Sequence, residues 1–178
     1  MSCSSGLQVS ELSPTEYHSY YEPYIVSLGN VGLMDAITCG LDDISHFALQ
    51  IPDSKMNYSY ADGKWSIAEV LVHLIDTERI FQYRALRFAR NDKRELQGFD
   101  QDFYVPQSLA NTRSKKDIVG EWMAVRNSSI ALFNSLGEIQ LKRSGSANGT
   151  PISVRALGFV ICGHQAHHFR ILKERYLA

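Results

Sequence analysis

Apolar residues recur at intervals of three and four positions along most of the chain, a pattern that is typical of amphipathic α-helices. The clearest stripe occupies residues 33–49, and similar patterns occupy residues 66–90, 114–136 and 153–176. No hairpin dipeptide lies between alternating apolar runs, and no internal repeat is visible. Four long helices of this kind predict an all-α fold in the form of a four-helix bundle.

Local signals mark where these helices begin. Ser66 is followed three positions later by Glu69, a capping box in which each side chain accepts a hydrogen bond from the other residue's backbone N–H. We expect Ser114 and Ser153 to begin the third and fourth long helices. Residues 14–28, interrupted by Pro23, predict a short helical extension at the N-terminal side.

Two connections are much longer than ordinary helix–helix turns. Residues 91–113 join the second and third long helices, and a stretch of this length either crosses the bundle or folds over a site. Residues 137–151 contain three glycines and predict a flexible joint.

Composition limits the class of protein. The 178 residues are 44% hydrophobic and 21% charged, which fits one globular domain over residues 1–178, with residues 1–13 expected to be a poorly ordered tail. The formal net charge of −1 argues against a nucleic-acid partner. No apolar run is long enough for a membrane span, and no export signal is visible. Three widely spaced cysteines indicate reduced thiols and a cytoplasmic protein.

Three histidines lie within five residues near the C-terminus. On a helical wheel His164 and His168, four positions apart, fall inside an apolar arc and face the core together. His167 falls at the edge of that arc, where we expect a hydrogen-bonding group beside the site.

His73 belongs to an apolar stripe of the second long helix. Three neutral imidazoles that met inside a bundle would need a partner for their lone pairs, and a divalent cation provides one. Three protein ligands leave positions open for water or substrate. A single histidine on an apolar face is more often a hydrogen-bonded core residue, so pattern alone leaves both interpretations open.

Several segments together resemble the DinB-like (DinB/YfiT, damage-inducible) superfamily of metalloenzymes. The segments that carry the resemblance are GKWSIAEVLVHLIDTER (63–79), GFDQD (98–102), SVRAL (153–157), GHQAHH (163–168) and ILKERY (171–176). The resemblance covers nearly the whole chain from about residue 17.

The resemblance implies an up-down-down-up order of the four helices and frequent homodimers. It also implies a divalent metal, nickel or zinc, held by His73, His164 and His168. Gln165 stands where many members have Glu; it points away from the ion and cannot act as a base. Without an H-E-x-x-H motif, a metalloprotease is not expected.

Relatives of this family use low-molecular-weight thiols such as bacillithiol or mycothiol. The leading hypothesis is therefore a metal-dependent thiol S-transferase or hydrolase, in which the ion activates a thiol or water for transfer to a small electrophilic molecule. Candidates for binding an anionic partner are two arginines and four tyrosines: Arg79, Arg84, Tyr17, Tyr20, Tyr21 and Tyr24. Asp76 is a candidate for a position near the ion, and its place in the sequence is equally consistent with an exposed acid.

Two questions stay open at the level of sequence. Asp100 and Asp102 lie in the long connection, and nothing in the sequence decides whether they reach the site. The alternative function is a non-catalytic, metal-stabilised bundle that serves as a binding or dimerisation module. An ion with an open position beside a pocket would favour the enzyme, and a closed ion would favour the module.

Overall fold

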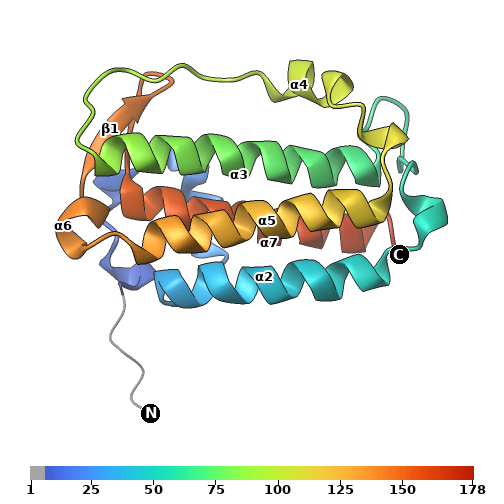
Figure 1. Cartoon of the computed structure of the whole chain (residues 1–178), viewed down its shortest axis with the longest axis horizontal. Helices are drawn as coiled ribbons and strands as arrows, with labels where there is room; N and C mark the ends of the chain where they lie inside the picture. The colour runs from blue at the N-terminus through green and yellow to red at the C-terminus, as the bar shows by residue number, and fades with distance from the viewer. Residues whose placement is uncertain (1–6) are drawn as a thin grey trace, which may run out of the picture.

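The computed structural model describes residues 7–178, which form seven α-helices, five short 3-10 helices and one β-hairpin. The α-helices and strands are α1 (Glu22–Val26), α2 (Leu33–Gln50), α3 (Ile67–Ala89), α4 (Gln101–Gln107), α5 (Lys115–Asn134), α6 (Glu138–Leu141), β1 (Ser144–Ala147), β2 (Thr150–Ser153) and α7 (Val154–Arg175). The long helices α2, α3, α5 and α7 lie along one another as a bundle (Figure 1). Both α2 and α3 pack against α5 and α7, which confirms the predicted four-helix bundle.

The predicted helix starts are confirmed by their caps. Ser66 Oγ accepts a hydrogen bond from Glu69 N at 3.2 Å, and Glu69 Oε2 accepts one from Ser66 N at 2.7 Å. Ser114 and Ser153 cap α5 and α7 in the same way, through the backbone N–H groups three positions on. These caps satisfy N–H groups that a helix leaves without an intrahelical partner.

Two apolar clusters divide the core along the bundle. In α2 and α7, residues of the cluster that contains Ile37 and Phe159 precede residues of the cluster that contains Phe47 and Leu172. In α3 and α5 the order is reversed, so these two helices run opposite to α2 and α7. A polar layer separates the clusters and consists of Gly40, Thr77, Glu78, Arg126, Ser129, His164 and Gln165.

The connection from α3 to α5 runs along the outside of the bundle to the opposite end, where α5 begins (Figure 1). It contains α4, whose N-terminus is capped by Asp100 through hydrogen bonds from Asp102 N and Phe103 N. Near its start, Leu96 N donates to Ser146 O at 3.0 Å. The connection is thereby fixed to the hairpin and stays against one side of the bundle.

The hairpin corrects the all-α prediction. Strands β1 and β2 pair antiparallel, and the turn between them is Asn148-Gly149, with φ of 55° and 73°. This dipeptide is a strong hairpin signal because both residues tolerate positive φ. The flanking residues are mostly small and polar and lack the alternating apolar pattern of an ordinary strand, so the local sequence does not predict the hairpin.

The beginning of the chain also differs from the prediction. Of the tail expected at residues 1–13, residues 1–6 lie outside the described residues. Residues 7–13 contact the start of α2 and the segment before it: Leu33 N donates to Leu7 O at 2.8 Å, and Val9 N donates to Val31 O at 3.1 Å. The short helices expected over residues 14–28 are present as two 3-10 turns and α1.

Candidate metal centre

The three histidines predicted to act together do meet between α3 and α7. Nε2 of His73 lies 3.2 Å from Nε2 of His164, and Nε2 of His168 lies 3.0 Å from the same atom. One ligand atom from each ring lies within 4.8 Å of the others, and in residues 7–178 no other group of this kind is found. His73 on α3 and the i, i+4 pair on α7 therefore form a single cluster of three nitrogen atoms.

All three rings are held in the neutral form by burial. Burial lowers the pKa of His73 from 6.5 to about 4. Burial, and to a smaller extent the neighbouring His73 and His167, lowers the pKa of His168 to about 3. The pKa of His164 is lowered as well, first by burial and then by the other histidines. Neutral imidazoles retain a lone pair, which metal coordination requires.

Hydrogen bonds within the cluster cannot satisfy these rings. Nε2 of His164 faces Nε2 of both other histidines, and an imidazole nitrogen carries either one proton or one lone pair. A single His164 nitrogen can therefore serve only one of its two neighbours well. Three lone pairs directed at one cation would satisfy all three nitrogens at once.

The surroundings orient the rings. The indole of Trp65 lies against His73, with ring centroids 4.9 Å apart, and Thr77 Oγ1 lies 3.5 Å from His73 Nδ1. Tyr24 of α1 contacts His164 edge-on, at 5.5 Å between centroids. This contact depends on Gly163, because a Cβ there would collide with the backbone carbonyl of Tyr24.

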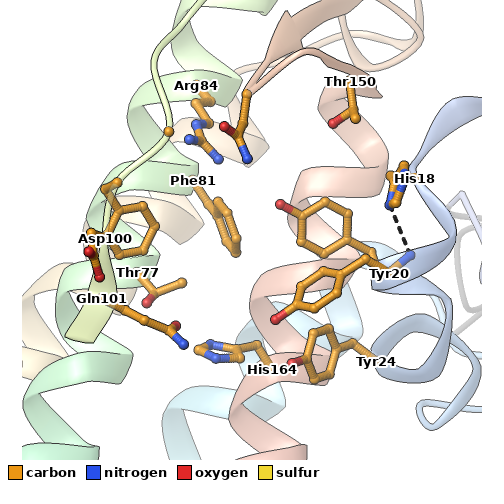
Figure 2. A pocket seen from close by; sticks show the side chains of 14 residues that line it. His18, Tyr20, Tyr24, Thr77, Phe81, Arg84, Asp100, Gln101, Thr150 and His164 are labelled. Carbon is orange, nitrogen blue, oxygen red and sulfur yellow. Dashed lines mark hydrogen bonds between the residues drawn. The ribbon is translucent and has the colours of Figure 1, made fainter. Parts of the chain in front are cut away.

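A cavity of about 570 Å³ opens beside His164. Its walls come from α3, from the tyrosine-rich segment around α1, from the crossover before α4 and from the hairpin (Figure 2). Thr77 and Gln101 lie near His164 in the lower part of Figure 2, whereas Arg84 and Thr150 lie in its upper part, at the other end of the cavity. The histidine cluster thus borders a space that is large enough for a small molecule.

The other predicted site residues have different positions. Asp76 is half-buried, and burial raises the pKa of its carboxyl group, with Arg79 opposing that effect. Arg79 pairs with Glu121 of α5 at 2.5 Å and lies 3.9 Å from Asp76. Neither Asp76 nor Arg79 lines the cavity or belongs to the histidine cluster.

Of the remaining candidates, some line the cavity and others lie outside the site. His167 lies edge-on against Tyr24 and His168, outside the three-nitrogen cluster. Tyr20 lines the cavity, with its ring largely exposed. Asp100 also lines the cavity, whereas Asp102 does not.

Several lining residues were not predicted. Phe99, Gln101, Asn148 and Thr150 reach the cavity from the crossover and the hairpin. Phe99 and Gln101 belong to the segment GFDQD (98–102) that carries part of the family resemblance, but no pattern predicts that they meet the hairpin, because that proximity depends on how the two segments are joined. Thr77 carried a signal, since it shares the apolar stripe of His73 one turn further along α3.

No helix in residues 7–178 combines the length and apolar character that a bilayer span needs.

The fold and the site together define a class of protein: four-helix bundles in which a cluster of three histidines borders a cavity. The profile of the DinB superfamily matches residues 40–172, and the chain belongs to this superfamily.

Two solved structures share the fold. YfiT from Bacillus subtilis, described as a probable metal-dependent hydrolase with an unusual four-helix bundle topology, aligns over 80% of this chain and 82% of its own, with a TM-score of 0.71 and 16% identity. A mycothiol-dependent maleylpyruvate isomerase aligns over 79% of this chain, with a TM-score of 0.62 and 10% identity. This chain spans only 60% of the isomerase. Comparison with curated protein sequences gives no match.

Proposed function

We propose that this protein is a divalent-metal-dependent enzyme that activates a low-molecular-weight thiol or water for transfer to a small electrophilic molecule. The observation that carries the proposal is the convergence of the His73, His164 and His168 nitrogens at the edge of an open cavity. The site residues are the same three that the sequence pattern selected.

The donor set fits a divalent ion. Two imidazole nitrogens bound tetrahedrally to zinc lie ~3.3 Å apart, given metal–nitrogen distances of about 2.0–2.1 Å. The observed separations of 3.2 and 3.0 Å agree with this spacing. A bound ion of this kind lowers the pKa of a coordinated thiol or water.

The chain's own side chains prepare the site for an external ligand. His164 lies both in the cluster and in the cavity wall, so a coordination position on this side is accessible from the cavity. Gln165 is turned away, because its Nε2 donates to Gly40 O at 3.0 Å. Among the cavity-lining residues the tyrosines and Phe81 supply an apolar and aromatic boundary.

Neither cysteine in residues 7–178 supplies a thiol to the site. Burial raises the pKa of the Cys162 thiol to about 12, so this group stays protonated. Neither Cys162 nor the exposed Cys39 lines the histidine cavity. The description of one fold relative as mycothiol-dependent supports the thiol branch, and the description of YfiT supports the water branch. Nickel or zinc as the ion, and a homodimer as the assembly, remain predictions.

The test combines metal-loaded protein with a panel of thiols. Protein purified without an affinity tag is loaded with zinc or nickel and mixed with bacillithiol or mycothiol and the fluorogenic electrophile monochlorobimane; ester hydrolysis is followed in parallel. We expect product formation that His164→Ala abolishes and that His46→Ala, an exposed control, retains. Full metal occupancy without turnover in either branch would instead support a metal-stabilised binding or dimerisation module.

A further inference from the structure

The cavity is elongated along α3. Thr77, Phe81 and Arg84 occupy successive turns of this helix and all line the cavity. Arg84 lies seven positions after Thr77, which is ~10 Å along the helix axis. The histidine cluster therefore borders one end of the cavity and Arg84 the other, as Figure 2 shows for His164 and Arg84.

Within residues 7–178, Arg84 is the buried arginine that pairs with no carboxylate. Three arginines are buried in residues 7–178, and two of them pair with a carboxylate: Arg126 with Glu78, and Arg155 with Glu16. Arg84 is only 5% exposed, and its hydrogen-bond partners are uncharged: Nη2 donates to the backbone carbonyl of Gln97 at 3.0 Å, and the side chain also interacts with the hydroxyl group of Tyr21. Because a guanidinium group stays charged in proteins and has five N–H donors, most of its capacity remains unused.

The nearby acids do not fill this role. Asp100 lines the same cavity, but its Oδ1 accepts hydrogen bonds from two backbone N–H groups at the start of α4. Glu95 lies on the surface, where its Oε1 accepts a hydrogen bond from Gly149 N at 2.8 Å. In the described part of the chain neither acid forms an ion pair with Arg84 within 4.0 Å, and Glu95 acts on Arg84 only as a more distant charge.

The wall between the two ends is mostly aromatic. The guanidinium group of Arg84 lies over the ring of Phe81, with 5.7 Å to the centroid. Tyr21 packs edge-on against Phe81, and Phe99 lines the cavity from the crossover. A ligand here would place an apolar segment between a charged end and a reacting end.

We propose that Arg84 binds a carboxylate of the small molecule that reacts at the histidine cluster, so that this ligand is an elongated carboxylic acid. The proposal rests on the proposed function for the reacting end of the ligand. A carboxylate matches the planar fork of an arginine and forms two charge-assisted hydrogen bonds with it. The acid belongs either to the thiol or to the electrophile, and both cases share this chemistry.

Thiols of graded length provide the test. Zinc-loaded protein is titrated calorimetrically with mercaptoacetate, mercaptohexanoate and mercaptoundecanoate, and with mercaptoethanol, mercaptohexanol and mercaptoundecanol as uncharged counterparts. We expect a long acid to bind about tenfold to a hundredfold more tightly than its alcohol, the range for hydrogen bonds to charged groups. Mercaptoacetate, which is too short to reach Arg84, should show no such advantage over mercaptoethanol.

Variants locate the effect. Arg84→Gln should remove the advantage of the long acid, and Arg84→Lys, which keeps the charge but loses the fork, should retain part of it. Arg87→Gln, one turn further along α3 and outside the cavity, is the matched control and should retain it fully. Equal zinc content in all proteins shows that the variants fold.

The outcomes separate the two proposals. If long acids and alcohols bind the wild type equally, the role of Arg84 is wrong while the metal site stands. If no thiol binds the zinc-loaded protein, the thiol branch of the proposed function fails, and this inference fails with it unless octanoate binds in an Arg84-dependent way. Octanoate, added after saturation with mercaptoethanol, identifies which molecule carries the carboxylate. If octanoate binds in an Arg84-dependent way, the carboxylate belongs to the second substrate. If octanoate does not bind while mercaptohexanoate still binds more tightly than mercaptohexanol, the carboxylate belongs to the thiol.

Discussion

Two clusters of buried polar side chains lie at the middle of the bundle, and they satisfy their polar atoms in different ways. In the first, Arg126 donates to both carboxylate oxygens of Glu78, at 2.8 and 3.0 Å, and Ser129 Oγ donates to the same carboxylate at 2.8 Å. In the second, three histidine nitrogens face one another without enough protons and lone pairs to pair them all.

The difference separates a structural cluster from a binding one. The Glu78–Arg126 pair is closed, because each charge finds its partner inside the chain. The histidine cluster is open, because its lone pairs converge and one of its rings borders a cavity. Converging lone pairs that the chain cannot pair internally are explained by an external ligand such as a cation.

Among single substitutions, the largest expected effect on stability comes from breaking the closed cluster. Glu78→Ala should lower the free energy of unfolding by about 3–5 kcal/mol, because it leaves the charge of Arg126 buried without a partner. Urea denaturation measures the change. The double variant Glu78→Leu with Arg126→Met should lose less, since no charge remains buried. A loss under about 1 kcal/mol for Glu78→Ala would show that the pair is not a structural element, because that is the range of surface pairs.

The open cluster should instead respond to metal. Zinc at a hundred times its dissociation constant should raise the free energy of unfolding by ~2.7 kcal/mol, because it binds the folded chain. The same urea titration, with and without zinc, measures this gain. His164→Ala should remove the gain, and an unchanged gain in that variant would place the ion elsewhere.

These two clusters also show what the sequence could predict. The histidine cluster was predictable because His164 and His168 lie one turn apart and His73 lies on an apolar stripe. The Glu78–Arg126 pair joins residues 48 positions apart, and its existence depends on how α3 packs against α5. The bundle was predictable because every long helix has its own apolar stripe and most have a cap at the start.

Local sequence patterns could not predict the hairpin or the way in which the cavity wall is assembled. Asn148 and Thr150 reach the cavity because the crossover pairs with the hairpin through Leu96. Arg84 was one candidate among several, and its lack of a carboxylate partner is visible only in three dimensions. Arg79, which the sequence made an equally good candidate for binding an anionic partner, forms an ion pair with Glu121 of α5.

Acid should destabilise the metal-free protein through the open cluster. The folded-state pKa is about 4 for His73 and about 3 for His168, both lowered by burial from 6.5. Between pH 6.5 and these values the unfolded chain binds more protons, so stability is full above pH 6.5 and falls as the pH drops. Each histidine should contribute up to ~1.4 kcal/mol per pH unit.

Urea titrations from pH 7 to pH 4 measure this slope, with His73→Gln as the comparison. Loss of one buried histidine should make the dependence on pH shallower. The same slope in His73→Gln and the wild type would mean that groups other than this cluster control the response to acid.

The smallest effect is expected for Arg79→Gln. The ion pair of Arg79 with Glu121 is partly exposed, and such pairs contribute about 0.2–1 kcal/mol. Zinc affinity should not change, because Arg79 lies outside both the cavity and the histidine cluster. A tenfold loss of zinc affinity would return Arg79 to the site.

Zinc titration of protein made without an affinity tag tests the central claim most directly, with wild type, His168→Ala and His167→Ala compared side by side. The account predicts that each wild-type chain binds one zinc ion. His168→Ala should lower the zinc affinity by at least about a hundredfold, which exceeds the effect of removing a group that only supports a ligand. His167→Ala should change the zinc affinity little. A wild type that binds no ion, or a loss confined to His167→Ala, would contradict it.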